Sequence, residues 1–174
     1  MKYRVIKKQH NTDMCFVCGM ENSAGTKAMF YDCENPDGNR VLLTIINPQN
    51  HHQSYPERMH GGIVSALLDE SMGRAVQCEK PDIWAVTVDL SVRFRKSTPL
   101  SETLYIESHV TSLDTRTYTS EGKLFLADGT ICATATSRFF IVPFDKAFAG
   151  HQLNDKNWLM VPDNVGEFIE ILSQ

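Results

Sequence analysis

Hydrophobic and polar residues follow two different periods along this chain, one typical of a helix and one typical of strands. The helical period covers residues 59–77. From Ile63 onward this segment contains no proline, and apolar residues recur at helical spacing around almost its whole circumference. They are Ile63, Val64, Leu67, Leu68, Met72, Ala75 and Val76. The pattern predicts a buried helix.

Strand-like segments lie on both sides of this helix. Residues 26–33 and 40–46 are separated by the strong turn signal Asn35-Pro36-Asp37-Gly38, so we expect a hairpin. After the helix, residues 83–94 alternate between an apolar and a polar face. The apolar face carries Trp84, Val86, Val88, Leu90, Val92 and Phe94, and the polar face carries Thr87, Asp89, Ser91, Arg93 and Arg95. Residues 102–113, 117–126 and 130–142 continue the meander, with Asp128-Gly129 as a hairpin turn.

One early helix followed by several long antiparallel strands predicts an α+β fold in which a sheet wraps around a single helix. A helix that is apolar nearly all round needs a curved sheet or a partner chain to cover it. We divide the chain into an N-terminal arm with a cysteine-containing turn (1–25), the sheet-and-helix domain (26–142) and a C-terminal tail (143–174).

The two ends of the chain are less regular than the middle. Residues 1–14 are polar and mixed, which predicts an arm that docks weakly or pairs with another copy. In the tail, Asp163 or Asn164 is expected to cap a short helix, and Trp158 and Leu159 are expected to anchor the tail to the body. The predicted helix carries Val165, Phe168, Ile169 and Leu172. The tail would cover an open edge or shape the entrance to a site.

Length, composition and net charge indicate which kinds of protein this chain can be. A chain of 174 residues with 42% hydrophobic content fits one globular domain. Its net charge of −4 and pI near 5.8 argue against a general nucleic-acid binder. No apolar run is long enough to span a membrane, and the first residues lack the hydrophobic stretch of a signal peptide, so we expect a cytoplasmic protein with no membrane partner. The five cysteines are expected to be reduced thiols.

The segment Cys15-Phe16-Val17-Cys18-Gly19 invites a zinc interpretation, because two cysteines at this spacing can bind one metal ion. A tetrahedral site needs two more ligands, and the sequence offers only Cys33, His51 and His52 without a second such motif. We therefore expect a tight turn with a buried Cys-Phe pair, closed by Gly19. No metal and no cofactor are expected.

Two features of the predicted helix point to chemistry. Gly61 and Gly62 open it, and a glycine pair at a helix start leaves backbone N–H groups that a negatively charged oxygen can approach. Asp69 lies two turns further on, beside Ser65, Ala66 and Gly73. A carboxylate in an apolar helix is unfavourable unless it is paired or used, so Asp69 is a candidate catalytic group.

The spacing of these two features constrains how they cooperate. Eight residue steps of about 1.5 Å separate Gly61 from Asp69 by roughly 12 Å along the helix axis. One helix cannot bring both groups to one small reacting centre. If they act together, Gly61 must come from one copy and Asp69 from a second, antiparallel copy, which predicts a symmetric dimer.

The sequence His60-Gly61-Gly62, followed by an apolar helix with Asp69 nine positions after His60, resembles the hotdog-fold acyl-CoA thioesterases of the phenylacetate-pathway and hydroxybenzoyl-CoA type. The resemblance covers residues 15–142. It includes the Cys15-Phe16-Val17-Cys18-Gly19 turn, which recurs in one branch of these proteins. It also includes the strand Thr87-Val88-Asp89-Leu90-Ser91-Val92-Arg93-Phe94. The resemblance implies a hotdog fold, an acyl-CoA substrate, and a homodimer or a homotetramer formed by two dimers.

The resemblance also implies roles for individual residues. The Gly61 N–H, helped by His60 and Gly62, would stabilise the thioester oxygen as charge develops on it. Asp69 of the partner would attack the thioester or act as general base on a water. Thr87 stands where similar enzymes place a hydroxyl that contacts the nucleophile or its water. His60 has a second interpretation, in which it only caps the helix.

Several neighbouring positions leave alternatives open. Similar enzymes place an Asn or Gln about six residues before the His-Gly pair, where it orients water or the thioester. This chain has Ser54 at that position, so the role falls to Gln53, Ser54 or Asn50, or to none of them. Glu70 is expected to pair with Arg74 rather than share the site, and it is the second candidate for the catalytic carboxylate.

Binding of CoA phosphates would require a local basic patch. Arg93 and Arg95, together with Lys96, offer such a patch near the end of a strand. The acyl group is left open, because Phe30, Tyr55, Trp84 and Phe94 fit either an aryl pocket or the core. Two other functions fit the same fold, namely a hotdog dehydratase or hydratase and a non-catalytic acyl-CoA sensor. Retention of Asp69 favours the thioesterase.

Overall fold

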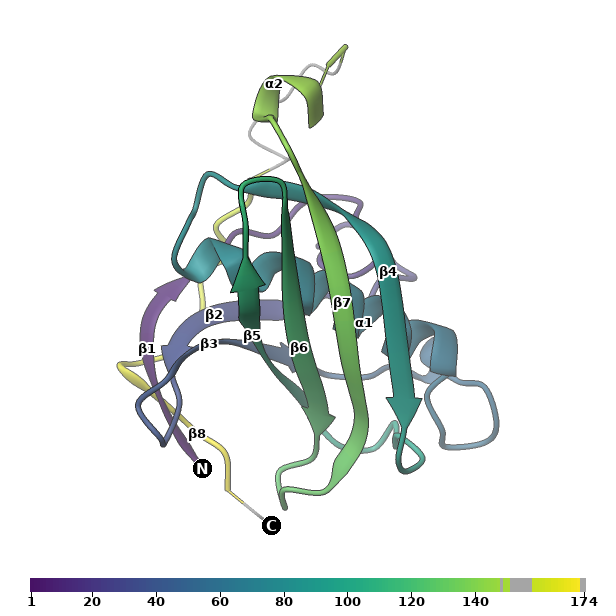
Figure 1. Ribbon diagram of the computed structural model, residues 1–174. Helices are drawn as coiled ribbons and strands as arrows, with labels where there is room; N and C mark the ends of the chain where they lie inside the picture. The colour runs from purple at the N-terminus through teal and green to yellow at the C-terminus, as the bar shows by residue number, and fades with distance from the viewer. Residues whose placement is uncertain (148, 151–157, 173–174) are drawn as a thin grey trace.

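A computed structural model of the protein describes residues 1–147, 149–150 and 158–172. An antiparallel sheet of eight strands among these residues curls around one long helix, α1 (Figure 1). The strands are β1 (Lys2–Lys8), β2 (Met29–Glu34), β3 (Arg40–Ile46), β4 (Trp84–Phe94), β5 (Leu104–Leu113), β6 (Thr117–Phe125), β7 (Ile131–Val142) and β8 (Phe168–Glu170). The helices are η1 (Asn50–His52), α1 (Gly61–Ala75), η2 (Val76–Cys78) and α2 (Phe144–Ala147). Their order confirms the predicted α+β architecture.

The strand order in the sheet is β4-β7-β6-β5-β3-β2-β1-β8. The predicted hairpin of β2 and β3 is confirmed, with Gly38 at φ 80° in its turn. The predicted turn at Asp128-Gly129 is also confirmed, because Gly129 has φ 84° between β6 and β7. None of the described helices is long and apolar enough to cross a bilayer.

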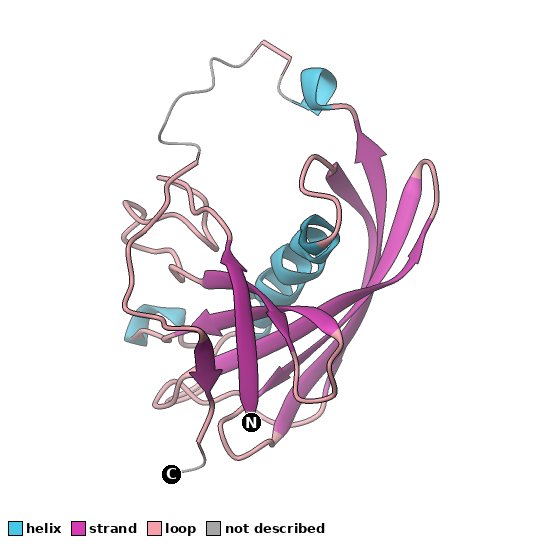
Figure 2. Ribbon diagram, turned by 90° about the vertical axis from the view of Figure 1, so that its left-hand side faces the viewer, coloured by secondary structure: helices cyan, strands magenta, loops and turns pink. Residues whose placement is uncertain are grey.

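Helix α1 lies in the concave side of the sheet (Figure 2). Leu67, Leu68 and Met72 are completely buried there, and each buried side chain of this size contributes about 1.5–3 kcal/mol of hydrophobic stabilisation. The close approach of β6 to the helix depends on Gly122, because a Cβ at that position would lie 3.0 Å from Met72 Cγ. The face of α1 that carries Asp69 is only half-buried within one chain.

The N-terminal residues are better integrated than the sequence predicts. The weakly docked arm expected for residues 1–14 is instead strand β1, which pairs with β2 on one side and with β8 on the other. Tyr3 is buried in a second apolar cluster, and its hydroxyl donates to Glu107 at 2.7 Å. Strand β1 is stabilised by pairing with β2 and with β8, which lies near the other end of the chain. The residue pattern of positions 2–8 alone therefore does not predict this strand.

The C-terminal tail also differs from its prediction. The short helix expected after Asp163 or Asn164 is wrong, because residues of that segment form strand β8 beside β1. The predicted anchors are confirmed. Leu159 forms a bridge with Asn11, and the ring of Trp158 lies 6.0 Å from the ring of Trp84. Of the two roles expected for the tail, the structure shows that β8 covers the edge of the sheet formed by β1.

Strand β4 does not alternate as strictly as its sequence does. A register shift between Thr87 and Asp89 makes Val88 an extra residue opposite β7, which is the signature of a β-bulge. Ala85, Leu90 and Val92 therefore pack against the core, whereas Val86 and Val88 are more than half exposed. The predicted single apolar face of this strand is wrong for that reason.

Candidate functional site

The start of α1 is capped by the residue before it. The His60 side chain accepts a hydrogen bond from Gly62 N through Nδ1 at 2.9 Å, and the N–H groups of Ile63 and Val64 donate to the His60 carbonyl. These bonds occupy the Gly62 N–H, which the sequence offers as a second oxyanion donor. Among the described residues, the Gly61 N–H has no hydrogen-bond acceptor. One amide therefore remains directed outward at the positive end of the helix.

The surroundings of Gly61 are open. A Cβ at this position would meet only the Phe94 ring, at 3.4 Å. Gln53 and Ser54 lie in the exposed loop before the helix, where the Gln53 Oε1 accepts from Glu57 N and the Ser54 N–H donates to the Arg58 carbonyl. Asn50 is exposed in η1. The side-chain amide N–H groups of Gln53 and the Ser54 hydroxyl have no partner among the described residues, so neither is committed to the fold.

Asp69 and Thr87 are brought together. The Thr87 hydroxyl donates to Asp69 Oδ1 at 2.9 Å, across the gap between α1 and β4. The bulge in β4 makes this contact possible, because it places Ala85 and Thr87 on the helix side of the strand. Both residues line a cavity of about 150 Å³ beside α1.

The environment of Asp69 changes its acidity. Burial raises the pKa of the Asp69 carboxyl above its ordinary value, the bond from Thr87 lowers it, and the neighbouring Glu70 raises it further. Burial is the largest of these effects. A carboxylate with a raised pKa binds a proton more strongly, which suits a general base or a nucleophile.

A second cavity, of about 580 Å³, adjoins the first. The two share His10, Gln77 and Trp84, and the larger one is also lined by Trp158 and Met160 from the tail. The His10 ring lies 6.2 Å from the Trp84 ring and 5.9 Å from the Trp158 ring. Of these aromatic residues, His10 and Trp84 also line the smaller cavity that contains Asp69.

His10 belongs to this site although the sequence gives no sign of it. Burial, followed by the positive charge of Arg74, lowers the pKa of His10 to about 4. The imidazole is therefore neutral at physiological pH. No motif surrounds His10 or Trp158, and only the fold places them beside α1. Of the aromatic residues left open above, Phe30 is completely buried in the core, Tyr55 is exposed and Trp84 lines the cavity.

Glu70 forms the predicted ion pair with Arg74, at 2.7 Å between Glu70 Oε1 and Arg74 Nε. The guanidinium is buried, donates to the His10 carbonyl and lies 4.3 Å from the Phe30 ring centre. Glu70 also lines the cavity that contains Asp69, but its carboxylate is paired with Arg74.

Arg93 and Arg95 lie together on a different surface. Leu90 and Val92 pack toward α1, so Arg93 projects from the opposite side of β4. Both arginines are exposed and line a cavity of about 470 Å³ with Lys123 and His109, and the acidic Glu107, which pairs with Lys123, and Glu121 line it as well. This cavity contains neither Asp69 nor Gly61. Within one chain, the basic patch is therefore separate from the candidate catalytic carboxylate, and Lys96 does not line its cavity.

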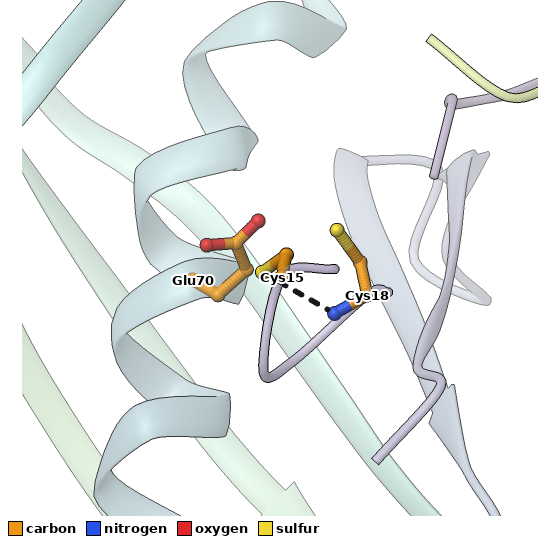
Figure 3. Close-up of side chains that lie close together, drawn as sticks. All are labelled: Cys15, Cys18 and Glu70. Carbon is orange, nitrogen blue, oxygen red and sulfur yellow. Dashed lines mark hydrogen bonds between the residues drawn. The ribbon is translucent and has the colours of Figure 1, made fainter. Parts of the chain in front are cut away.

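The two cysteines of the N-terminal turn meet a third residue. Cys15, Cys18 and Glu70 place their side-chain donor atoms within 4.8 Å of one another (Figure 3). Cys33, His51 and His52, which the sequence offers as further ligands, are not part of this group. The expected burial of Phe16 is wrong, because 40% of this residue is exposed. Hydrogen bonding with Cys18 lowers the pKa of the Cys15 thiol, whereas the same interaction and burial raise the pKa of the Cys18 thiol.

Sequence comparison identifies one protein family. The model of the thioesterase superfamily matches residues 57–133, which include the helix start, Asp69 and Thr87. No curated protein sequence matches this chain.

Comparison with solved structures gives the same family. A crystal structure described as a thioesterase superfamily protein is 28% identical, with a TM-score of 0.61 over 72% of this chain and 62% of that one. This chain thus spans less than two thirds of that protein. A Bacillus halodurans protein solved with CoA is 26% identical, with a TM-score of 0.53 over 57% of this chain and 66% of that one. A Streptococcus mutans protein bound to acetyl CoA is 21% identical, with a TM-score of 0.54 over 59% of this chain and 82% of that one.

Proposed function

This chain belongs to the thioesterase superfamily and has its hotdog fold, and on that basis we propose that it is an acyl-CoA thioesterase. The observation that carries the proposal is the pairing of Asp69 with Thr87 at an open cavity beside an apolar helix. A non-catalytic binding protein gains nothing from a carboxylate whose burial opposes its ionisation. The neighbours solved with CoA and acetyl CoA support a CoA thioester as the substrate.

In the proposed reaction, the ionised Asp69 activates the attack on the thioester carbonyl. It either removes a proton from the attacking water or attacks the carbonyl carbon itself, giving a mixed anhydride that water then hydrolyses. In both routes the C–S bond breaks, CoA leaves as a thiol after protonation, and a free acid is formed. Thr87 positions the carboxylate through the hydrogen bond that it donates.

The developing negative charge on the carbonyl oxygen needs a donor, and the Gly61 N–H supplies it in this proposal. It stands at the N-terminus of α1, where the helix dipole favours negative charge. His60 serves as the cap of the helix and holds the Gly62 N–H, so it acts on the geometry of the loop. Gln53 or Ser54 remains available to contact the substrate from the exposed loop before the helix.

The site is proposed to form between two chains. Gly61 and Asp69 of one helix are too far apart to reach one carbonyl group, as the helical rise requires. Strand β4 is an edge of the sheet, and its Val86 and Val88 are 56% and 52% exposed. An exposed apolar edge strand is a ready surface for pairing with another chain. Antiparallel pairing of two copies would cover this edge and the half-buried face of α1 in a dimer, which is also the unit from which a homotetramer would be built.

The acyl group is proposed to occupy the aromatic cavity that adjoins Asp69. Trp84 and Trp158 supply flat apolar surfaces on one side of it and His10 is neutral, while Lys7, Lys8, Asp32 and Asp82 also line this cavity. The exposed pair Arg93 and Arg95 is proposed to meet CoA phosphates, since guanidinium groups bind phosphate oxygens in pairs.

Release of free thiol from a panel of acyl-CoAs tests this function. The panel should contain aryl, medium-chain and long-chain thioesters, and wild-type protein should be compared with Asp69→Ala. We expect turnover by the wild type and none by the variant. Tight binding of several acyl-CoAs without turnover by the wild type would contradict the proposal and indicate a sensor.

A further inference from the structure

The Cys15-Phe16-Val17-Cys18-Gly19 turn is held in place by several hydrogen bonds. The Gly19 N–H donates to the Cys15 carbonyl at 2.8 Å, and a Cβ at Gly19 would lie only 2.3 Å from that oxygen. The Asn11 side chain is completely buried and donates to the carbonyls of Cys18 and Ala28, both at 2.9 Å. These bonds fix the turn against strand β2 and hold its two sulfur atoms on the side that faces α1.

The Cys15 sulfur accepts hydrogen bonds from its own turn. The Val17 N–H points at Cys15 Sγ at 3.3 Å, and the Cys18 N–H points at the same sulfur at 3.5 Å (Figure 3). Backbone N–H groups directed at one sulfur favour its thiolate form. The thiolate is the form that binds metal ions.

Helix α1 places a carboxylate opposite the two sulfurs. Figure 3 shows Glu70 projecting from the helix toward the turn, and its carboxylate lies within 4.8 Å of both sulfur atoms. A tetrahedral zinc ion, with Zn–S bonds of about 2.3 Å, holds two sulfurs roughly 3.8 Å apart. Small side-chain rotations therefore suffice to bring all three donor atoms to one ion.

Arg74 balances the charge of this group. Its guanidinium donates to Glu70 through Nε at 2.7 Å and to Cys18 Sγ through Nη2 at 3.4 Å. Two thiolates and one carboxylate would place three negative charges beside the single positive charge of Arg74. A divalent cation makes the sum zero, which favours its binding in a partly buried cluster. The same guanidinium would orient two of the ligands by hydrogen bonds, as residues around metal ligands commonly do.

We propose that Cys15, Cys18 and Glu70 form a binding site for a divalent, thiophilic metal ion, of which Zn²⁺ is the best fit. Both sulfurs bind as thiolates, so each thiol that still carries a proton releases it to solvent, and two metal–sulfur bonds and one metal–oxygen bond form. Cys15 and Glu70 are only half-buried, so solvent supplies the remaining ligand. The third donor of this group comes from α1 and stands in no sequence relation to the two cysteines, so the spacing of the cysteines alone does not reveal it.

The role that follows from this placement is structural. The ion would join the N-terminal turn to the middle of α1, one residue from Asp69. The site does not depend on the thioesterase reaction, and it can exist whether or not the proposed function is correct. Its effect should therefore be visible in the stability of the protein without any substrate.

The test uses full-length protein that has been reduced and freed of metal with a chelator. Zn²⁺ is titrated into the wild type, Cys15→Ser, Glu70→Gln and, as a matched control, Cys132→Ser, whose thiol lies outside the cluster. We expect one ion to bind per chain in the wild type and the control, with a rise in melting temperature and release of protons from the thiols that are still protonated. Affinity should fall by more than about 100-fold in Cys15→Ser and by about 10-fold or more in Glu70→Gln.

A second measurement requires no variant. Zn²⁺ should slow alkylation of Cys15 and Cys18 in the wild type, read by mass spectrometry of the peptides, and leave the rate at Cys132 unchanged. Equal Zn²⁺ affinity in the wild type and Cys15→Ser would overturn the proposal. So would unchanged alkylation rates, or a Cys15–Cys18 disulfide as the only product when oxygen and Zn²⁺ are both present.

Discussion

Replacement of Asp69 by asparagine separates the charge of this residue from its shape. The asparagine side chain keeps an oxygen in the place where Asp69 Oδ1 accepts the 2.9 Å hydrogen bond from Thr87. The side chain should therefore stay in position at the cavity. It cannot take up a proton from water and is a poor nucleophile, so Asp69→Asn removes the chemical role and leaves the contact.

The expected loss follows from what a positioned base contributes. General-base catalysis accelerates reactions by about 10²–10⁴-fold, so we expect kcat/KM to fall by about 10³-fold, equivalent to about 4 kcal/mol of transition-state stabilisation. Stability should change in the opposite direction. Because burial raises the pKa of Asp69, its ionised form opposes folding at every pH above that raised pKa, and Asp69→Asn removes this cost. Solvent screens a half-buried carboxylate in part, so we expect a gain of only about 1 kcal/mol in the free energy of unfolding at neutral pH, shrinking as the pH falls through the pKa.

The assay is steady-state release of CoA thiol, run beside chemical denaturation of the same samples. Asp37→Asn is the matched control, since Asp37 is exposed in the turn between β2 and β3, and it should change neither quantity measurably. A variant that retains more than about a tenth of wild-type kcat/KM, with folding intact, would refute the assignment of Asp69 as base or nucleophile.

Three further changes test neighbouring parts of the account. Thr87→Val removes the hydrogen bond that lowers the pKa of Asp69, so kcat should fall by about 10-fold and the acidic limb of the pH–rate profile should move to higher pH; an unmoved limb would separate Thr87 from Asp69 function. Val88→Lys puts a charge on the exposed edge strand, so sedimentation should show dissociation of the dimer together with loss of activity, and an active dimer would exclude this edge as the interface. Gly19→Ala should lower the free energy of unfolding by more than about 2 kcal/mol, because a Cβ would lie 2.3 Å from the Cys15 carbonyl, whereas Gly166→Ala, which has open space, should not.

The sequence predicts the centre of this fold well because that part is strongly periodic. The apolar spacing from Ile63 to Val76 and the turn signals at Gly38 and Gly129 each depend on neighbouring residues alone. The bulge at Val88 does not, because it is defined by the pairing of β4 with β7. It reverses which residues of the strand face the helix, and it is the reason that Thr87 reaches Asp69.

The candidate site was predictable only where its residues stand in one helix or in a motif. Gly61 and Asp69 are visible from the helical pattern itself. His10 and Trp158 come from opposite ends of the chain. They lie beside Trp84 because β1, which precedes His10, and β8, which follows Trp158, pair at the same end of the sheet. The closeness of Glu70 to the two cysteines is likewise invisible in the sequence, because it depends on where the N-terminal turn packs against α1.

The claim that one active site uses two chains is tested most directly by mixing two defective subunits. Asp69→Asn lacks the carboxylate and Gly61→Val obstructs the oxyanion donor, so each homodimer should be inactive. A heterodimer purified through two different tags would contain one site with both defects and one intact site, and should recover about half of the wild-type activity. A heterodimer as inactive as its parents would show that both residues serve the same chain, which contradicts the account.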